Sequence, residues 1–466
     1  MLTFLAYTLG CKLNLLESEA FTEVFLQAGF SLYNKNLSSY PSVILINTCT
    51  VTSKADQKAR RVIRKALRDF PDSLILVTGC YAKLNQSEII NLGENQNDSF
   101  FVLQGLTKEN ILCLPHYLDT GSVSNSLKTW YEDLLKEKNE QHPNNEEKKV
   151  FQFSPKQFSG HTRSFLKIQD GCDNHCTYCK IRLARGSSIS LDSNQVLARL
   201  KILETQYAET VLTGVNISQY SGRMSGDKSH NASCGSLGEL LEFLLAGTSK
   251  IALRLSSLAP DRIDDSFAKV LTDKRIRPHF HLSLQSGSKK ILEKMGRNYD
   301  AGIIEKSVNL LRSVKDDPFL ACDIITGFPG ESEMDFIETL DLCRRIGFAW
   351  IHVFPFSKRQ GTPAWSFSDT VNDKEINRRV QLLTDLAWSG RADYITRWLG
   401  KEVDVLIEKK NLDKLSYHGI SENYLKLLIF CNGENVPLRG DVIRCRLGQE
   451  KINEKKDYDA IAFTDK

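Results

Sequence analysis

Three cysteines, Cys172, Cys176 and Cys179, lie close together and are separated by three residues and then by two. Thiolates at such short spacings are ligands for zinc or for an iron–sulfur cluster. A structural zinc site takes four protein ligands, so His175 would have to complete it, whereas three cysteines on a 4Fe–4S cluster leave one iron open. The triplet therefore predicts a cluster that can bind a substrate or cofactor. A zinc site, or cysteines that only pack, are the alternatives.

Three more cysteines each follow a run of residues that is typical of a buried strand. They are Cys11 after the run at 2–8, Cys49 after 43–48 and Cys80 after 74–79. Because helical patterns alternate with these apolar runs, we expect a parallel sheet covered on both faces. Ligands bind at the carboxyl ends of such strands, so the three thiols are expected to meet and hold a second cluster with one open iron. The alternative is three independent buried cysteines.

Further strand-like runs alternate with helical patterns in the middle of the chain. They lie at 164–169, 209–213, 251–255, 279–284, 320–326 and 350–354. Six such repeats are too few for a closed eight-stranded barrel and favour an open, partial barrel. The loop that carries Cys172 would follow its first strand directly.

The expected fold is an α/β chain in three domains. Residues 1–121 form the parallel-sheet domain, 122–158 a charged linker, 159–399 the partial barrel and 400–466 a small antiparallel β-barrel. The last segment has short strand-like runs and carries twelve Lys or Arg against twelve Asp or Glu, so its net charge predicts no partner.

Composition excludes several classes of protein. The net charge of +4 is nearly balanced, and no apolar run approaches the roughly 18 residues needed to cross a membrane. The chain starts directly in a strand-like run without a signal segment, and twelve cysteines are too few for a disulfide scaffold of this length. We therefore expect a cytoplasmic protein. The helix expected near 54–69 carries seven basic and two acidic residues, which indicates either phosphate binding or a solvated face.

Six blocks of sequence, in order along nearly the whole chain, are similar to those of the radical SAM methylthiotransferases. They read TLGCKLN at 8–14, NTCTVT at 47–52, TGCYA at 78–82, FLKIQDGC at 165–172, LQSGS at 284–288 and TGFPGE at 326–331. The first and fourth blocks most resemble the branch that acts on N6-threonylcarbamoyladenosine at position 37 of tRNA. The C-terminal segment resembles the family's RNA-binding TRAM domain. A departure occurs after the third cysteine of the triplet, where Arg182 stands in place of the common proline.

The resemblance implies two 4Fe–4S clusters and S-adenosylmethionine (SAM) as cofactors. The cluster on Cys172, Cys176 and Cys179 would bind SAM and generate a radical, and the cluster on Cys11, Cys49 and Cys80 would hold the sulfur that is transferred. Candidate SAM contacts, each of which could equally be an ordinary polar or aromatic residue at a strand end, are Tyr178, Thr213, Gly214, Asn216, Ser256, Gln285 and Asp323.

The resemblance also implies partners. These are the anticodon loop of tRNA and a reduced electron donor such as a flavodoxin or ferredoxin, with the sulfur donor unspecified. An aromatic C–H offers neither an acidic proton nor a leaving group, which is why radical chemistry is expected. Alternative substrates are isopentenyladenosine in tRNA and an aspartate of a ribosomal protein. The alternative outside catalysis is an iron–sulfur protein that binds RNA or acts as a sensor.

Overall fold

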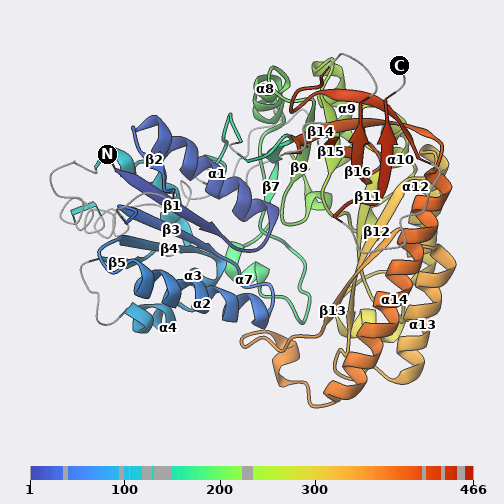
Figure 1. The fold of residues 1–466 in the computed structure, drawn as a ribbon. Helices are drawn as coiled ribbons and strands as arrows, with labels where there is room; N and C mark the ends of the chain where they lie inside the picture. The colour runs from blue at the N-terminus through green and yellow to red at the C-terminus, as the bar shows by residue number, and fades with distance from the viewer. Residues whose placement is uncertain are drawn as a thin grey trace.

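The computed structural model describes residues 2–34, 40–93, 99–103, 105–117, 129–130, 150–158, 160–222, 235–411, 416–431, 436–448 and 457–464. Over these residues the chain forms a parallel α/β sheet, an open barrel beside it and a small closed barrel (Figure 1). This architecture confirms the fold class expected from the sequence.

The N-terminal domain is a five-stranded parallel sheet in the order β2-β1-β3-β4-β5. Its strands are β1 (Thr3–Thr8), β2 (Ser31–Leu32), β3 (Val43–Thr48), β4 (Leu74–Gly79) and β5 (Phe100–Val102). Every residue of β3 and β4 is buried, because α1 (Lys12–Gln27) covers one face while α2 (Ser53–Asp69), α3 (Cys80–Leu84) and α4 (Gln86–Ile90) lie on the other (Figure 1). The carboxyl ends of β1, β3 and β4 point toward the open barrel.

Helix α1 begins directly after Cys11, and the polar residue Asn14 holds its first turn in place. Its amide nitrogen donates to the Leu9 carbonyl at 2.8 Å and to the Thr48 carbonyl at 3.0 Å. These bonds fasten the first turn of α1 to the ends of β1 and β3, where cysteines lie.

The central domain contains the six predicted strands, all parallel to their neighbours, in two sheets of order β10-β9-β6 and β11-β12-β13. The strands are β6 (Ser164–Lys167), β9 (Glu209–Thr213), β10 (Ala252–Leu255), β11 (His279–Gln285), β12 (Phe319–Thr326) and β13 (Trp350–Pro355), with a small pair β7 (Gln169–Asp170) and β8 (Ile189–Ser190). Isolated parallel bridges, one of them between Leu258 and Leu282, link the two sheets. The helices are α7 (Ile181–Arg185), α8 (Ser193–Glu204), α9 (Leu237–Gly247), α10 (Asp265–Leu271), α11 (Lys289–Lys294), α12 (Ala301–Val314), α13 (Glu333–Ile346) and α14 (Asp373–Trp398).

The C-terminal domain is a closed five-stranded barrel in the order β14-β15-β16-β18-β17. The strands are β14 (Glu402–Lys410), β15 (Ser416–Ser421), β16 (Lys426–Phe430), β17 (Val442–Leu447) and β18 (Ala460–Phe463). The expectation of a purely antiparallel barrel is wrong in one place, because β18 enters between β16 and β17 and pairs with β16 in parallel.

The small barrel packs against the amino ends of the open barrel's strands. The turn between β15 and β16 places the ring of Tyr424 3.9 Å from the ring of His279. Beneath it, Glu209 accepts from Arg254 at 2.6 Å and from Arg277 at 3.0 Å. Burial alone would raise the pKa of Glu209, but these arginines lower it to about 2, so the carboxylate stays charged inside the protein.

The predicted charged linker, 122–158, lies mostly outside the described residues. Its described end is not solvated, since Phe151, Phe153 and Phe158 are buried in the main core. These rings pack into the core because burying apolar surface is favourable even when the neighbouring residues are polar. No helix within the described ranges is long and apolar enough to cross a membrane.

Candidate functional site

Cys11, Cys49 and Cys80 lie at the carboxyl ends of β1, β3 and β4, as predicted from the sequence. Cys49 and Cys80 are buried and Cys11 is exposed. Gly10 has a φ of +99°, and a Cβ atom there would stand 2.5 Å from the Cys49 Sγ. Gly79, also at +99°, would place a Cβ 2.3 Å from the Thr48 carbonyl oxygen. Only glycine permits these approaches, so the two glycines bring the three strand ends together.

The three thiols also act on one another electrostatically. Burial raises the pKa of the Cys49 thiol to about 11, and the neighbouring Cys11 and Cys80 raise it further. Burial likewise raises the pKa of Cys11, while Arg185 acts in the opposite direction. A metal that binds here must displace the thiol protons, as soft, thiolate-binding metals do.

Within the described residues, no group of three or more His, Cys, Asp or Glu side chains is arranged around a single metal ion. A 4Fe–4S cluster differs from a zinc ion, because each cysteine binds a separate iron and the sulfurs stand around the cluster instead of converging on one centre. Three thiols at three strand ends, with no histidine among them, therefore fit a cluster with one open iron better than they fit zinc.

The triplet of Cys172, Cys176 and Cys179 begins just after β7. Gln169 fixes this start, because its amide nitrogen donates to the carbonyls of Asp170 at 2.9 Å and Gly171 at 2.8 Å. Its amide oxygen accepts from the backbone of Asn216 at 2.9 Å. Burial raises the pKa of Cys172, and hydrogen bonds from the Asn174 backbone and the Asn216 side chain oppose the rise. The loop is thus held to the end of β9.

The rest of the triplet lies under a cluster of aromatic rings. The hydroxyl of Tyr178 accepts from Arg297 at 2.8 Å, and its ring packs edge-on against Phe328. The Cys179 sulfur accepts from the Ile181 backbone at 3.4 Å, and burial raises the pKa of this thiol to about 11. Sequence reasoning did not single out Arg297, which follows the helix α11 and carries no motif of its own.

His175, the fourth ligand that a zinc site would need, has another partner. Its Nε2 atom is hydrogen-bonded to the Arg182 guanidinium, which also donates to the Asp173 carbonyl at 3.0 Å. A ring that faces a cation is poorly placed to bind a second one. The departure at Arg182 therefore occupies the histidine and disfavours the zinc alternative.

A cavity of about 250 Å³ lies between the two cysteine-bearing domains. One wall is the loop Thr50–Thr52 after β3, and the others come from the Cys179 loop and the carboxyl ends of β11, β12 and β13. Three of the predicted SAM contacts line it, namely Tyr178, Gln285 and Asp323, as does Arg297. Asp323 faces His281, whose Nε2 is 2.8 Å from its carboxylate.

The four other predicted SAM contacts do not line this cavity. They are Thr213, Gly214, Asn216 and Ser256. Asn216 lies beside Cys172, as described above, and a Cβ on Gly214 would stand 2.8 Å from the Gln169 amide oxygen. Thr213 and Ser256 are buried. These residues thus lie along the ends of β9 and β10, on the Cys172 side of the site.

Arg359 connects two segments that line the cavity, the loop after β3 and the segment after β13. It donates to the Thr50 carbonyl at 2.8 Å and pairs with Asp56 at 2.8 Å, and Ser53 bonds to Ser357 at 2.8 Å between the hydroxyls. The start of α2 is therefore fastened to the segment after β13. Sequence reasoning missed this contact because Arg359 belongs to no motif block, although its partner Thr50 lies in the block at 47–52.

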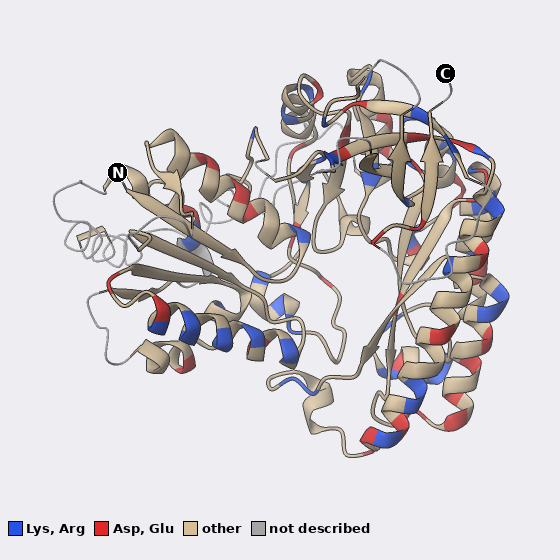
Figure 2. Cartoon of the chain, in the orientation of Figure 1, with Lys and Arg blue, Asp and Glu red and all other residues tan. Residues whose placement is uncertain are grey.

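Helix α2 carries the basic stretch noted in the sequence. Its apolar side, which includes Ala59 and Ile63, is buried. Lys and Arg residues, blue in Figure 2, recur along the length of the helix and form a basic row. Exposed members of that row are Lys54, Lys58, Arg61, Arg64, Lys65 and Arg68. The row begins at the cavity, since α2 follows Thr52.

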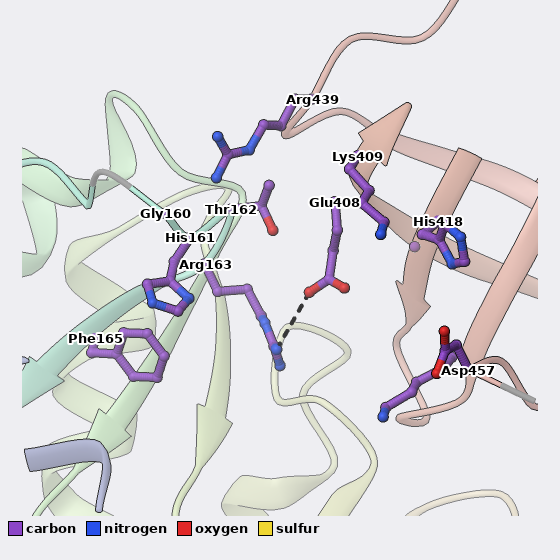
Figure 3. Close-up of a pocket in the computed structure, with 12 residues that line it drawn as sticks. Gly160, His161, Thr162, Arg163, Phe165, Glu408, Lys409, His418, Arg439 and Asp457 are labelled. Carbon is purple, nitrogen blue, oxygen red and sulfur yellow. Dashed lines mark ion pairs between the residues drawn. The ribbon is translucent and has the colours of Figure 1, made fainter. Parts of the chain in front are cut away.

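A larger cavity, of about 650 Å³, lies at the other end of the open barrel, between the start of β6 and the C-terminal barrel (Figure 3). Its charged lining residues are Arg163, Lys409, Lys426, Arg439, Glu408 and Asp457. Arg163 pairs with Glu408 at 3.5 Å, and cations outnumber carboxylates around the cavity. The electrically neutral C-terminal domain therefore has a basic side.

Comparison with known proteins places this geometry in a family. Residues 3–102 match the model described as "Uncharacterized protein family UPF0004", and residues 166–343 match the Radical SAM superfamily. The radical SAM methyltransferase TsrM from Kitasatospora setae, solved with cobalamin and a 4Fe–4S cluster, is 14% identical with a TM-score of 0.49, covering 78% of this chain and 76% of that one.

Curated relatives cover almost the whole chain. The threonylcarbamoyladenosine tRNA methylthiotransferase MtaB of Treponema pallidum is 36% identical over 95% of this chain and 98% of its own length. MtaB of Bacillus subtilis is 32% identical over 92% and 90%. The tRNA-2-methylthio-N(6)-dimethylallyladenosine synthase of Rickettsia rickettsii is 26% identical over 96% and 97%. The chain therefore belongs to the radical SAM methylthiotransferase family.

Proposed function

We propose that this protein is a tRNA methylthiotransferase that converts N6-threonylcarbamoyladenosine to its 2-methylthio derivative. The observation that carries the proposal is a set of three thiols in each of two domains, beside a cavity that is lined by Cys179 from one domain and by the loop after Cys49 from the other. The names of relatives that are 31–36% identical support the choice of substrate over the dimethylallyladenosine of a relative at 26%.

Each loop offers a donor set suited to one cluster. Cys172, Cys176 and Cys179 would hold the first 4Fe–4S cluster, and the N-terminal set, Cys11, Cys49 and Cys80, would hold the second. With SAM bound at the open iron of the first cluster, one electron from a reduced flavodoxin or ferredoxin would cleave SAM to methionine and a 5′-deoxyadenosyl radical. The second cluster would hold the sulfur, and another SAM would supply its methyl group.

The chain's own residues orient the reactants and keep water away. The Arg297–Tyr178 hydrogen bond holds the Cys179 loop against its aromatic support. Gln285 and Asp323 present polar groups to the cavity, where we assign them to the ribose or methionine of SAM. Asn216, beside Cys172, is assigned to the same ligand from the opposite side. Enclosure between two domains protects a radical from solvent and from side reactions.

Lys12 offers a means of substrate recognition. It follows Cys11 directly, is exposed, and takes part in none of the ion pairs found among the described residues. The protein around Lys12 lowers the pKa of its ammonium by desolvation, Arg163 and Arg254 add to this effect, and Tyr424 and Asp323 oppose it, so the ammonium lies near charged groups of both barrels. The threonylcarbamoyl group carries a free carboxylate, which an ammonium group attracts, whereas a dimethylallyl group is a hydrocarbon.

The tRNA backbone would follow the basic row of α2 toward the cavity at its start. Phosphates provide most of the sequence-independent affinity for such a surface. The basic cavity beside Arg163 and Lys409 would contact a second part of the same tRNA, away from the reacting base.

The test combines metal analysis with nucleoside analysis. Anaerobic reconstitution should give about eight irons per chain, and Cys80→Ala about four, with SAM cleavage retained. Cys431→Ala, which changes a cysteine outside both triplets, should keep about eight. Cells that lack the gene should lose 2-methylthio-N6-threonylcarbamoyladenosine and regain it on re-expression. Unchanged levels of that nucleoside in the deleted cells would refute the assignment of N6-threonylcarbamoyladenosine as the substrate.

A further inference from the structure

Arg185, the last residue of α7, lies buried at the junction of the two cysteine-bearing domains. One guanidinium nitrogen, Nη1, donates to the Asp170 carboxylate at 3.1 Å and to the Glu17 carboxylate at 3.2 Å. The other, Nη2, donates to the Asn14 amide oxygen at 3.0 Å. A single planar group therefore bonds to both domains at once, which suits the fixed fork of arginine.

Two of the three partners of Arg185, Asp170 and Asn14, are themselves bonded to segments that carry cysteines. Asp170 accepts the backbone N–H of Gly171 at 2.8 Å, immediately before Cys172. On the other side, Asn14 lies 3.8 Å from the Cys11 sulfur and donates to the carbonyl of Thr48, the residue before Cys49. A short chain of hydrogen bonds thus connects the start of one cysteine triplet with two cysteines of the other.

The two carboxylates of this junction share three cations inside the protein. Lys108 pairs with Glu17 at 2.5 Å, and Lys167 pairs with Asp170, so each carboxylate has two cationic partners. Burial would raise the pKa of Glu17, but Lys108 and Arg185 lower it to about 2. Breaking such a network leaves a buried charge without its partner, which is far more costly than losing a surface pair.

Arg185 also faces the N-terminal thiols. Burial lowers the pKa of its guanidinium, and Asp170, Cys80, Glu17 and Cys11 outweigh that effect and raise it well above its usual range. Arginine stays protonated at any working pH, so a fixed positive charge stands beside this cysteine set. Charge and hydrogen bonding near an iron–sulfur cluster are principal determinants of its reduction potential.

We propose that Arg185 is a positioning residue that holds the two cysteine loops in register and sets the potential of the cluster on the N-terminal cysteines. The inference rests on the proposed function, because it assumes that this set binds a cluster. Its positive charge favours the more negative, reduced state of the cluster. The hydrogen bonds of Arg185 to Asp170, Glu17 and Asn14 fix the distance between the two cysteine sets, which hold the sulfur and generate the radical.

The experiment separates these two effects in the full-length, anaerobically reconstituted protein. In a Cys176→Ala background, which removes the first cluster, a redox titration followed by electron paramagnetic resonance reports on the second cluster alone. We expect Arg185→Gln to lower that potential and Arg185→Lys to leave it nearly unchanged, because lysine keeps the charge. An unaltered potential in Arg185→Gln would overturn the electrostatic part of the proposal.

With both clusters present, the readout is methylthiolated tRNA formed per 5′-deoxyadenosine released. Arg185→Gln and Arg185→Lys should both lower this ratio, by about 10- to 100-fold, since an ammonium group cannot bond three acceptors in the guanidinium geometry. Arg277→Gln, which removes a buried arginine from the Glu209 pair instead, should keep the wild-type ratio. A wild-type ratio in Arg185→Lys would overturn the positioning role, and this variant decides the question if Arg185→Gln does not fold.

Failure of the proposed function would look different. The Cys176→Ala protein with wild-type Arg185 would then hold almost no iron where about four are expected. That result would overturn the second cluster itself, and with it the inference about Arg185. If the Cys176→Ala protein holds about four irons and Arg185→Gln leaves the reduction potential of that cluster unchanged, only the inference about Arg185 would be overturned.

Discussion

Replacing Gly171 with alanine should disable the first cysteine triplet while sparing the second. Gly171 has a φ of +69°, and a Cβ atom there would stand 1.9 Å from the Ser187 carbonyl oxygen. The next residue, Cys172, donates its backbone N–H to the Gly186 carbonyl at 3.1 Å, so the two segments are already in contact. The added methyl group must push them apart by about 1 Å to reach even a tight contact.

The cost can be divided into two parts. An L-residue in the left-handed region costs about 1–2 kcal/mol, and overpacking against a fixed neighbour adds about 1–3 kcal/mol. Gly347 provides the matched control, because its φ is +63° and nothing lies within 4 Å of the position its Cβ would take. Gly347→Ala should therefore cost about 1–2 kcal/mol, and Gly171→Ala about 2–5 kcal/mol.

Thermal unfolding, iron content and 5′-deoxyadenosine formation measure the outcome. Gly171→Ala should retain about four of eight irons and lose at least tenfold in SAM cleavage, whereas Gly347→Ala should keep both near wild type. If Gly171→Ala binds about eight irons and cleaves SAM at the wild-type rate, the close packing of the Cys172 loop against 186–187 does not position its cluster. The geometric argument would then be wrong.

Three further outcomes follow from charge. Glu209→Gln should lower stability by about 3–5 kcal/mol in urea unfolding, while the exposed Glu305→Gln costs under about 1 kcal/mol. The pKa of Glu209 falls from 4.5 to about 2 on folding, so its ionisation contributes about 3 kcal/mol to the free energy of unfolding. This contribution is complete above pH 4.5 and is lost as the pH falls toward 2. The stability of the Gln variant should lack this dependence on acid pH. Arg61→Glu with Lys65→Glu should raise KM for tRNA and reduce the salt dependence of binding by about two phosphate contacts, with tRNA-independent SAM cleavage unchanged. Lys12→Met should lower kcat/KM for threonylcarbamoylated tRNA by about tenfold, or roughly 1.4 kcal/mol, and an unchanged value would exclude Lys12 from substrate recognition.

The parts of the fold that repeat were predictable from the sequence. Three of the five strands of the N-terminal sheet and the six strands of the open barrel were expected from apolar runs, which a parallel sheet buried on both faces demands. The short strands β2 and β5, of two and three residues, were not predicted. The C-terminal barrel was predicted only in outline, because neither β15 nor β18 is evident as an apolar run and the parallel pairing of β16 with β18 depends on a distant part of the chain. The buried rings at 151–158 were missed because a polar composition hides single aromatic side chains.

Within the site, sequence reasoning found the residues that belong to motifs and missed those that connect them. The cysteines lie where the strand pattern placed them, and Tyr178, Gln285 and Asp323 line one cavity. Arg297 could not be found, since a lone arginine after a helix has many possible roles. Tyr178 was predicted only as a SAM contact from its position beside Cys179. A hydrogen bond from Arg297 and contact with Phe328 also give it a structural role, which the motif did not indicate.

The division of the site between two domains explains why such connecting residues matter. Among the residues that the structure describes, no strand ladder joins the N-terminal sheet to the open barrel, so side chains must set the separation of the two cysteine sets. Two buried arginines do so from opposite sides of the junction, Arg185 through Asn14 and Arg359 through Thr50 and Asp56. Arg185 binds the segment that follows β1, where Cys11 lies, and Arg359 binds the segment that follows β3, where Cys49 lies. A change at either arginine should therefore act on the coupling of the two half-reactions before it acts on either cluster alone.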